Sequence, residues 1–158
     1  MKTRSSRYRA GSGPVLVGCS SFKLRQLSRR VSQEYDAVMA DSGLKTSQYS
    51  LLSKIVKRGP IKPGQLADEM EMDASTLTRN LQPLVARGWA QIGPGEDGRS
   101  RRVSVTVAGR EKRAEAKRTW KRAQLAFNAR LGTALVGRLH EALDECLALM
   151  GESPDPGE

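Results

Sequence analysis

A change of hydrophobic period past the middle of the chain constrains the fold more than any other feature. Before it, apolar residues recur at spacings of three and four, which is typical of helices that bury one face. After it, Val103, Val105 and Val107 alternate with polar residues, and this two-residue period indicates a half-buried strand. A shorter strand is predicted over residues 89–92. The segment between the strands, 93–102, includes three glycines and a proline, so we expect a hairpin with a long loop.

Four helices are predicted before the hairpin, at about 20–40, 46–57, 63–70 and 74–87. Thr46 and Asp73 have side chains that can cap the second and the fourth of them. Pro63 suits a first helical position, where its missing N–H costs nothing, and Gly88 is typical of a helix end. The third and fourth helices, joined by a short turn, are therefore predicted to form a helix-turn-helix pair.

Two more helices are predicted after the hairpin. The first ends at Gly132, and its apolar stripe consists of Ala116, Trp120, Ala123, Phe127 and Leu131. Thr133 can cap the second, whose stripe we expect to face inward. That stripe consists of Leu135, Leu139, Leu143, Cys146 and Met150. Cys146 is thus predicted to be a small core residue, whereas His140 is expected to be exposed.

Helices followed by a two-stranded wing predict a winged helix-turn-helix fold, within a mainly helical chain with a small β-wing. Such a domain is too small to cover the apolar stripes of three further helices, so we expect a homodimer in which the terminal helices interlock. The expected organisation is a flexible basic arm over residues 1–18, an N-terminal dimerisation helix over 19–43, the winged helix-turn-helix domain over 44–107, C-terminal dimerisation helices over 108–150 and a disordered tail over 151–158.

The charge of the chain is large and unevenly placed. Lys and Arg number 27 and Asp and Glu 17, which gives a formal net charge of +10 over 158 residues. Residues 1–30 hold eight basic side chains and no acid, and residues 98–122 hold ten bases and two acids. Nucleic acid is therefore the first partner to expect. The alternative for residues 110–122 is an ordinary solvated helix face.

The composition also excludes several classes of protein. With two cysteines and one histidine, the chain offers neither a disulfide scaffold nor a four-ligand zinc site. We find no Ser/His/Asp set, no paired acid and base and no phosphate loop, so we expect no enzyme activity, no cofactor and no metal. Apolar runs are too short for a membrane span or a signal peptide. A cytoplasmic protein without a membrane partner is expected.

The residues at this point resemble a known family. The run from Asp73 to Trp89, followed by the run from Asp97 to Gly109, looks like the recognition helix and wing of the MarR family of bacterial transcriptional regulators. Residues 46–52 and 65–68 also fit. The resemblance covers roughly residues 19–145. It implies a homodimeric repressor or activator that loses DNA affinity when a small phenolic or other aromatic ligand binds, or when a cysteine is oxidised.

The outward face of the helix predicted over 74–87 is the expected base-reading surface. Its apolar stripe turns Ser75, Thr76, Arg79 and Asn80 away from the core, near the end that a recognition helix presents to the major groove. Arg79 can pair with guanine and Asn80 with adenine, whereas Ser75 and Thr76 suit phosphates or thymine methyl groups. The complete set of expected DNA contacts is Thr46, Gln48, Lys62, Ser75, Thr76, Thr78, Arg79, Asn80, Arg99, Arg101 and Arg102. A solvated helix face is the alternative.

The wing and two helix starts supply the rest of that set. Arg99 is expected at the wing tip, where it can enter a minor groove. One of Arg101 and Arg102 is expected to meet phosphate while the other pairs with Asp97, a role that the resemblance gives to Arg101. The side chains near the starts of the second and third helices lie where backbone N–H groups can also bind phosphate.

Effector sites are predicted from fewer residues. Tyr35, Met39, Tyr49 and Trp120 could line a ligand pocket between the dimerisation helices and the winged domain, and plain core is the alternative for each. Cys19 is the candidate redox site because basic residues follow it in the first helix. The peroxide-sensing relatives hold their cysteine at the position of Ser21.

The sequence therefore favours a sequence-specific, homodimeric regulator of double-stranded DNA with an inverted-repeat site. A repressor released by a small aromatic ligand or by oxidation is expected. The alternative is a winged-helix interaction module that binds RNA or protein without effector control.

Overall fold

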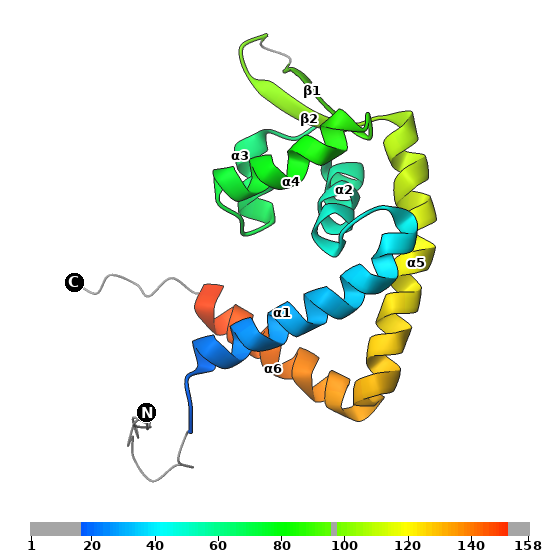
Figure 1. The fold of residues 1–158 in the computed structure, drawn as a ribbon. Coiled ribbons are helices and arrows are strands. Elements are labelled where there is room, and N and C mark those ends of the chain that lie inside the picture. Colours follow the sequence, from blue (N-terminus) through cyan, green and yellow to red (C-terminus); the bar gives the residue numbers. More distant parts are fainter. Residues whose placement is uncertain (1–16, 96–97, 152–158) are drawn as a thin grey trace, which may run out of the picture.

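The computed structural model describes residues 17–95 and 98–151, and in it helices predominate over one short hairpin (Figure 1). The elements are α1 (Ser20–Met39), a 3₁₀ turn η1 (Ala40–Ser42), α2 (Thr46–Arg58), α3 (Pro63–Glu69), α4 (Ala74–Ala86), β1 (Ala90–Pro94), β2 (Arg101–Val105), α5 (Val107–Leu131) and α6 (Thr133–Gly151). The predicted mainly helical fold with a small β-wing is confirmed. The predicted arm, apart from Val17 and Gly18, and the predicted tail beyond Gly151 lie outside the described residues.

Figure 1 shows two parts of the chain. The helices α2, α3 and α4 and the hairpin form one unit, which we call the winged domain. The helices α1, α5 and α6 frame it on the other side, and we call them the terminal helices. The long α5 joins the two parts, because it begins directly after β2 and packs against both α1 and α2.

Local caps set the ends of the helices in the winged domain. Asp73 caps α4 as predicted, with its carboxylate accepting from the Thr76 N–H, and Pro63 is the first residue of α3. The predicted cap of α2 was wrong. Lys45 is the N-cap residue, and Thr46 is already helical with its N–H donated to Asp36 Oδ1 at 2.7 Å. A carboxylate from α1 thus accepts from the first N–H of α2.

The hairpin is antiparallel, and its register pairs Ala90 with Val105 and Ile92 with Val103. Val103 is completely buried against the domain, as its place in the alternating pattern predicts. The predicted strand extended too far, because Val107 is 75% exposed and begins α5.

A threonine cap explains this early end of the strand. Thr106 precedes α5, and its hydroxyl accepts from the Gly109 N–H at 3.0 Å. Gly109 is required here, since a Cβ at that position would collide with the Trp89 carbonyl. The cap and the glycine together turn the chain from strand to helix beside the start of the hairpin.

Two hydrophobic clusters hold the two parts. The larger one fills the winged domain and contains most of the completely buried side chains: Met39, Leu51, Leu52, Ile55, Leu66, Leu84 and Val103. The smaller one joins the terminal helices and consists of Tyr35, Ala123, Phe127 and Val136. The predicted stripes of α4 and α5 therefore do face a core.

The predicted stripe of α6 is a different case. Within the single chain Leu135 is 44% exposed, Met150 is 83% exposed and Cys146 is also exposed, so the prediction that Cys146 is a core residue was wrong for the isolated chain. Val136 is the buried side chain of this helix instead. The reason is that α6 packs against α5 with one face, and no element among the described residues covers its opposite face. His140 is exposed, as expected. No helix in the described ranges has the length and hydropathy to cross a membrane.

Candidate DNA interface

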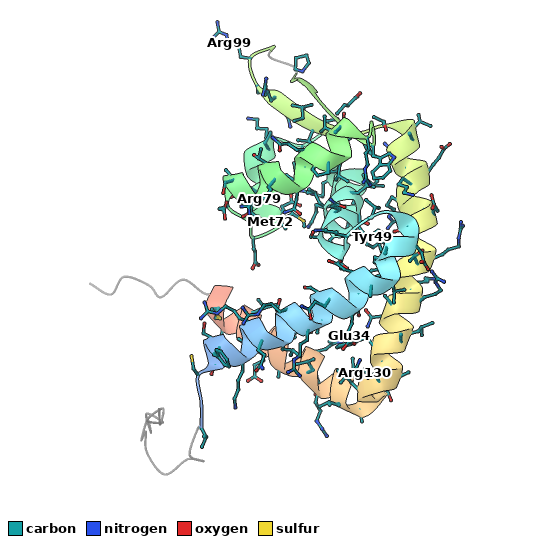
Figure 2. The ribbon with its side chains drawn as sticks, in the orientation of Figure 1. Glu34, Tyr49, Met72, Arg79, Arg99 and Arg130 are labelled. Carbon is teal, nitrogen blue, oxygen red and sulfur yellow. The ribbon has the colours of Figure 1, made fainter. Side chains whose placement is uncertain are left out.

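The exposed face of α4 carries polar side chains at helical spacing. Leu77, Leu81 and Leu84 point into the core, which turns Ser75 and Arg79 outward. Gln82 is also exposed, and its position three residues after Arg79 and seven after Ser75 places it on the same face. Sequence reasoning missed Gln82, although this spacing could have found it. Figure 2 labels Arg79 on this helix and Arg99 at the wing, both on the side of the winged domain turned away from α5.

The first turn of α4 is organised by one carboxylate. Asp73 Oδ1 accepts from the Thr76 N–H at 2.7 Å and from Ser75 Oγ at 2.5 Å, while Oδ2 accepts from Thr76 Oγ1 at 2.9 Å. The hydrogen bond from Ser75 and then those from Thr76 lower the pKa of Asp73 to about 2. The carboxylate is therefore ionised at any physiological pH. It holds the hydroxyl groups of Ser75 and Thr76, which are two of the predicted DNA contacts, in place.

Thr78 and Asn80, two further predicted residues of α4, also have internal partners. The Thr78 hydroxyl donates to the Ala74 carbonyl at 2.8 Å. Asn80 Nδ2 donates to the Thr76 carbonyl at 3.0 Å, and Asn80 Oδ1 accepts from Ser47 Oγ at 3.0 Å. Because a carbonyl can only accept, the Thr76 carbonyl fixes which end of the Asn80 amide faces it. Ser47 is a residue that sequence reasoning missed, and a contact across 33 positions leaves no local signal.

The wing presents its arginines on two faces. Arg99 is exposed at the loop between β1 and β2, as predicted (Figure 2). Arg101 lies on the α4 side of the hairpin, where it lines an apolar groove of about 500 Å³ with Leu81, Gln82 and other residues. Arg102 lies on the opposite side, beside Pro60. The proposed Asp97 partner of one of these arginines lies outside the described residues.

Three predicted contacts lie at helix starts. Lys62 is exposed and is the N-cap residue of α3. Gln48 is half-buried, and its Oε1 accepts from the Lys45 N–H at 3.0 Å. The hydroxyl of Thr46 is buried and has no hydrogen-bond partner among the described residues. A phosphate contact from Thr46 would therefore need a change of rotamer, whereas Lys62 can reach solvent directly.

Comparisons with known proteins agree on one family. The family model described as MarR family matches residues 42–100, which span the end of η1 to the wing. An HTH-type transcriptional regulator of Mycobacterium bovis, Mb0904, is 30% identical over 126 residues that cover 79% of this chain and 88% of the relative. This chain belongs to the MarR family. It is a DNA-binding transcriptional regulator of the MarR type and not an enzyme, as the sequence predicted.

Solved structures of transcriptional regulators have the same fold. The transcriptional regulator MosR of Mycobacterium tuberculosis, solved in complex with DNA, is 28% identical, and the match covers 82% of this chain and 98% of that chain with a TM-score of 0.64. A probable transcriptional regulator from Pseudomonas aeruginosa is 26% identical, with coverage of 80% and 96% and a TM-score of 0.73. The described elements are thus those of a MarR-type winged helix-turn-helix with additional helices at both ends.

The four candidate ligand residues are spread over both clusters. Met39 and Tyr49 are buried in the core of the winged domain, and the Tyr49 ring stacks on Trp120 with 6.0 Å between centroids. Tyr35 belongs to the smaller cluster, where its hydroxyl donates to Gln124 Oε1 at 2.9 Å. Burial raises the pKa of the Tyr35 phenol. Tyr35 also lines a groove of about 310 Å³ between α1, α5 and α6.

The cysteines are exposed and unpaired within the part of the chain that is described. Cys19 lies directly before α1, as the sequence predicts, and Cys146 lies on α6. No group of three or more potential metal ligands occurs in residues 17–95 and 98–151.

Proposed function

We propose that this MarR-family protein is a homodimeric repressor that binds an inverted repeat in double-stranded DNA. The observation that carries the proposal is the pairing of two surfaces in one chain. The winged domain presents Arg79 and Arg99 on one side (Figure 2). The helices α1 and α6 leave apolar side chains exposed, among them Leu24 and Met150. A two-fold dimer built through those helices would offer two recognition helices to two half-sites.

In this proposal α4 enters the major groove and the wing follows the adjacent minor groove. The guanidinium of Arg79 suits a bidentate contact with guanine O6 and N7. Arg99 suits the negative potential of a narrow minor groove. Lys62 and one of the wing arginines Arg101 and Arg102 would meet phosphates and fix the register without reading sequence.

The dimer would form through the terminal helices. Leu24 and Leu27 on α1 and Leu139 and Leu143 on α6 line the open groove of about 310 Å³, and Leu135 and Met150 extend the apolar surface along α6. A surface of this kind on a protein free in water marks an interaction site. Residues 19–43 and 108–150 would then be dimerisation segments, and residues 44–107 the DNA-binding domain.

We propose release by a small aromatic ligand in the same groove. Tyr35 and Gln124 would supply a polar contact in an otherwise apolar lining that includes Phe127. A ligand there would change how α1 packs on α5 and hence the spacing of the two recognition helices. Oxidation of the exposed Cys19 is the second candidate signal. The protein would act in the compartment that holds the DNA.

Selection of bound duplexes from a random pool tests the core of the proposal. The expected result is an inverted repeat whose half-sites are about one helical turn apart. Selection of a single half-site, or retention of RNA and random DNA as strong as that of the selected duplex, would favour the alternative of a winged-helix module that binds RNA or protein. Transcription from a promoter that carries the selected site should fall when the protein is added, and it should recover with a small phenolic compound. Cys19→Ser should abolish any recovery that an oxidant produces.

A further inference from the structure

Three hydroxyl groups in the first turns of α4 all donate their protons to acceptors in the same helix start. Ser75 Oγ and Thr76 Oγ1 are bonded to the Asp73 carboxylate, and Thr78 Oγ1 is bonded to the Ala74 carbonyl. An ionised carboxylate and a carbonyl can only accept hydrogen bonds, so the hydroxyls must be the donors. The pKa of Asp73, lowered to about 2, keeps the carboxylate ionised in any physiological buffer.

This arrangement determines what the hydroxyls can still offer to DNA. A hydroxyl has one proton and two lone pairs, and here the proton is already used. Phosphate oxygens, thymine O4 and guanine O6 and N7 are acceptors, so they cannot bond to these groups without breaking the network. The amino groups of adenine N6 and cytosine N4 are the donors that the major groove presents. Lone pairs on Ser75 and Thr76 therefore match adenine or cytosine.

We propose that Asp73 is a positioning residue for specificity, because it holds the Ser75 and Thr76 hydroxyls as acceptors and so makes the start of α4 select adenine or cytosine. Asp73 itself need not touch DNA. The inference rests on the proposed placement of α4 in the major groove. Arg79, one turn farther along, offers only donors and would select guanine. In the major groove of each half-site, the start of α4 would thus read adenine or cytosine through the amino group, and Arg79 would read guanine through O6 and N7.

Asp73→Asn tests this with almost no change of shape. Asn is as good an N-cap as Asp, so α4 should keep its start. The Thr76 N–H needs an acceptor, which keeps the amide oxygen of the substituted side chain in the place of the carboxylate oxygen that now accepts it. The amide nitrogen then replaces Oδ2 opposite Thr76 Oγ1 and donates to that hydroxyl. The Thr76 proton must turn outward, whereas the Ser75 proton still has its acceptor.

The measurement is binding-site selection with wild type, Asp73→Asn, Thr76→Val and the double variant. Wild type should enrich adenine or cytosine at the base facing Thr76. Asp73→Asn should shift that position toward thymine or guanine, with a change in relative enrichment of about three- to tenfold, as expected for one hydrogen bond. Thr76→Val should lose the preference without reversing it, and the double variant should match Thr76→Val. Ser75→Ala is the matched control, because it should alter a different position equally in both backgrounds.

Several results would overturn the proposal. Asp73→Asn could retain the wild-type preference, or it could weaken binding to all sequences alike, which is what a purely structural cap would do. If Asp73→Asn failed to fold, as judged by its circular dichroism and melting, Thr76→Val alone would decide, since loss of a thymine or guanine preference contradicts the proposal. Arg79→Ala distinguishes failure of the proposed function from failure of this inference alone. If Arg79→Ala and Thr76→Val both leave binding unchanged, α4 does not read DNA and the proposed function fails. If Arg79→Ala shifts base preference and Asp73→Asn does not, only this inference fails.

Discussion

The winged domain and the terminal helices bury their apolar side chains to very different degrees. Leu51, Leu66 and Leu84 of the winged domain are completely buried within a single chain. In the terminal helices Leu24 is 52% exposed and Met150 is 83% exposed, although their sequence spacing is just as regular. The difference teaches that apolar periodicity reports which face of a helix will be buried, but not whether the covering surface belongs to the same chain.

Ion pairs, by contrast, join helices within both parts. Within the winged domain, Arg58 donates from Nε and a terminal nitrogen to the Glu69 carboxylate, which joins the end of α2 to α3. In the terminal helices the ion pair between Arg130 and Glu34, at 3.0 Å, lies at the margin of the smaller cluster (Figure 2). Ion pairs therefore do not distinguish the two parts, and the contrast between them lies in the burial of apolar side chains.

The largest expected effect on stability comes from truncating a leucine of the winged domain, and a leucine of the terminal helices provides the comparison. Leu84→Ala should lower the free energy of unfolding by about 2–5 kcal/mol, because it removes buried methyl groups and leaves a cavity. Leu135→Ala should cost less than about 0.5 kcal/mol in the monomer, where the side chain is exposed. Urea unfolding at several protein concentrations measures both. A concentration-independent loss of several kcal/mol for Leu135→Ala would contradict the contrast between the two parts.

A charge on the exposed apolar surface should act on assembly and not on folding. Leu24→Glu leaves a solvated carboxylate in the monomer but buries it in the proposed dimer, at a cost of at least about 2 kcal/mol per subunit. Light scattering should therefore report a dimer for wild type at micromolar concentration and a monomer for the variant, with circular dichroism unchanged. Ser50→Glu, at an exposed position of α2 outside the proposed dimerisation segments, is the matched control. A wild-type protein that stays monomeric would contradict the proposed dimer.

The sequence predicted most of the winged domain because its signals are local. The Asp73 cap, the α4 stripe and the break at Gly132 each depend on residues within a turn or two, and the structure confirms them. Val107 was misassigned because the alternation of valines continues one step beyond the point where the Thr106 cap begins a helix.

Contacts between distant segments were beyond the sequence pattern. The Asp36 carboxylate accepts from the Thr46 N–H at the start of α2, and Ser47 donates to the Asn80 amide oxygen from another helix. Both depend on how the helices are placed in space, which propensity does not specify. Asn80 was predicted as a base reader from its exposure on a helix face, and its contact with DNA stays a prediction. The exposure of Leu135 and Cys146 was not predicted for a similar reason, since an apolar pattern does not specify whether the covering surface belongs to the same chain.

Arg79→Ala should separate recognition from assembly. We expect a loss of about 1–3 kcal/mol in specific binding and a relaxed preference at one base position in each half-site, because a bidentate contact with guanine is removed. Fluorescence anisotropy with matched and mismatched duplexes measures this change. The dimer should be unaffected, as Arg79 is exposed on the winged domain and not on a terminal helix (Figure 2). Specific binding that stays within error of wild type would refute this role for Arg79.

Arg99→Ala should have the smallest effect, and it should be of a different kind. The wing arginine is proposed to lie in a minor groove, whose negative potential is strongest where the groove is narrow, as in A-tracts. Its removal should therefore reduce affinity most for sites with A/T-rich flanks. Loss of one phosphate-like contact per subunit should also flatten the log–log salt dependence by up to about two units per dimer. Arg79→Ala should instead shift base preference inside the half-site and leave flank preference unchanged.

Salt titrations of both variants on A/T-rich and G/C-rich flanks distinguish these roles. The two arginines belong to the same winged domain, so a difference between them cannot come from assembly through the terminal helices. If Arg99→Ala kept the wild-type flank preference and salt slope, the hairpin would not contact DNA. The basic segment 98–122 would then be a solvated surface, and recognition would depend on α4 alone.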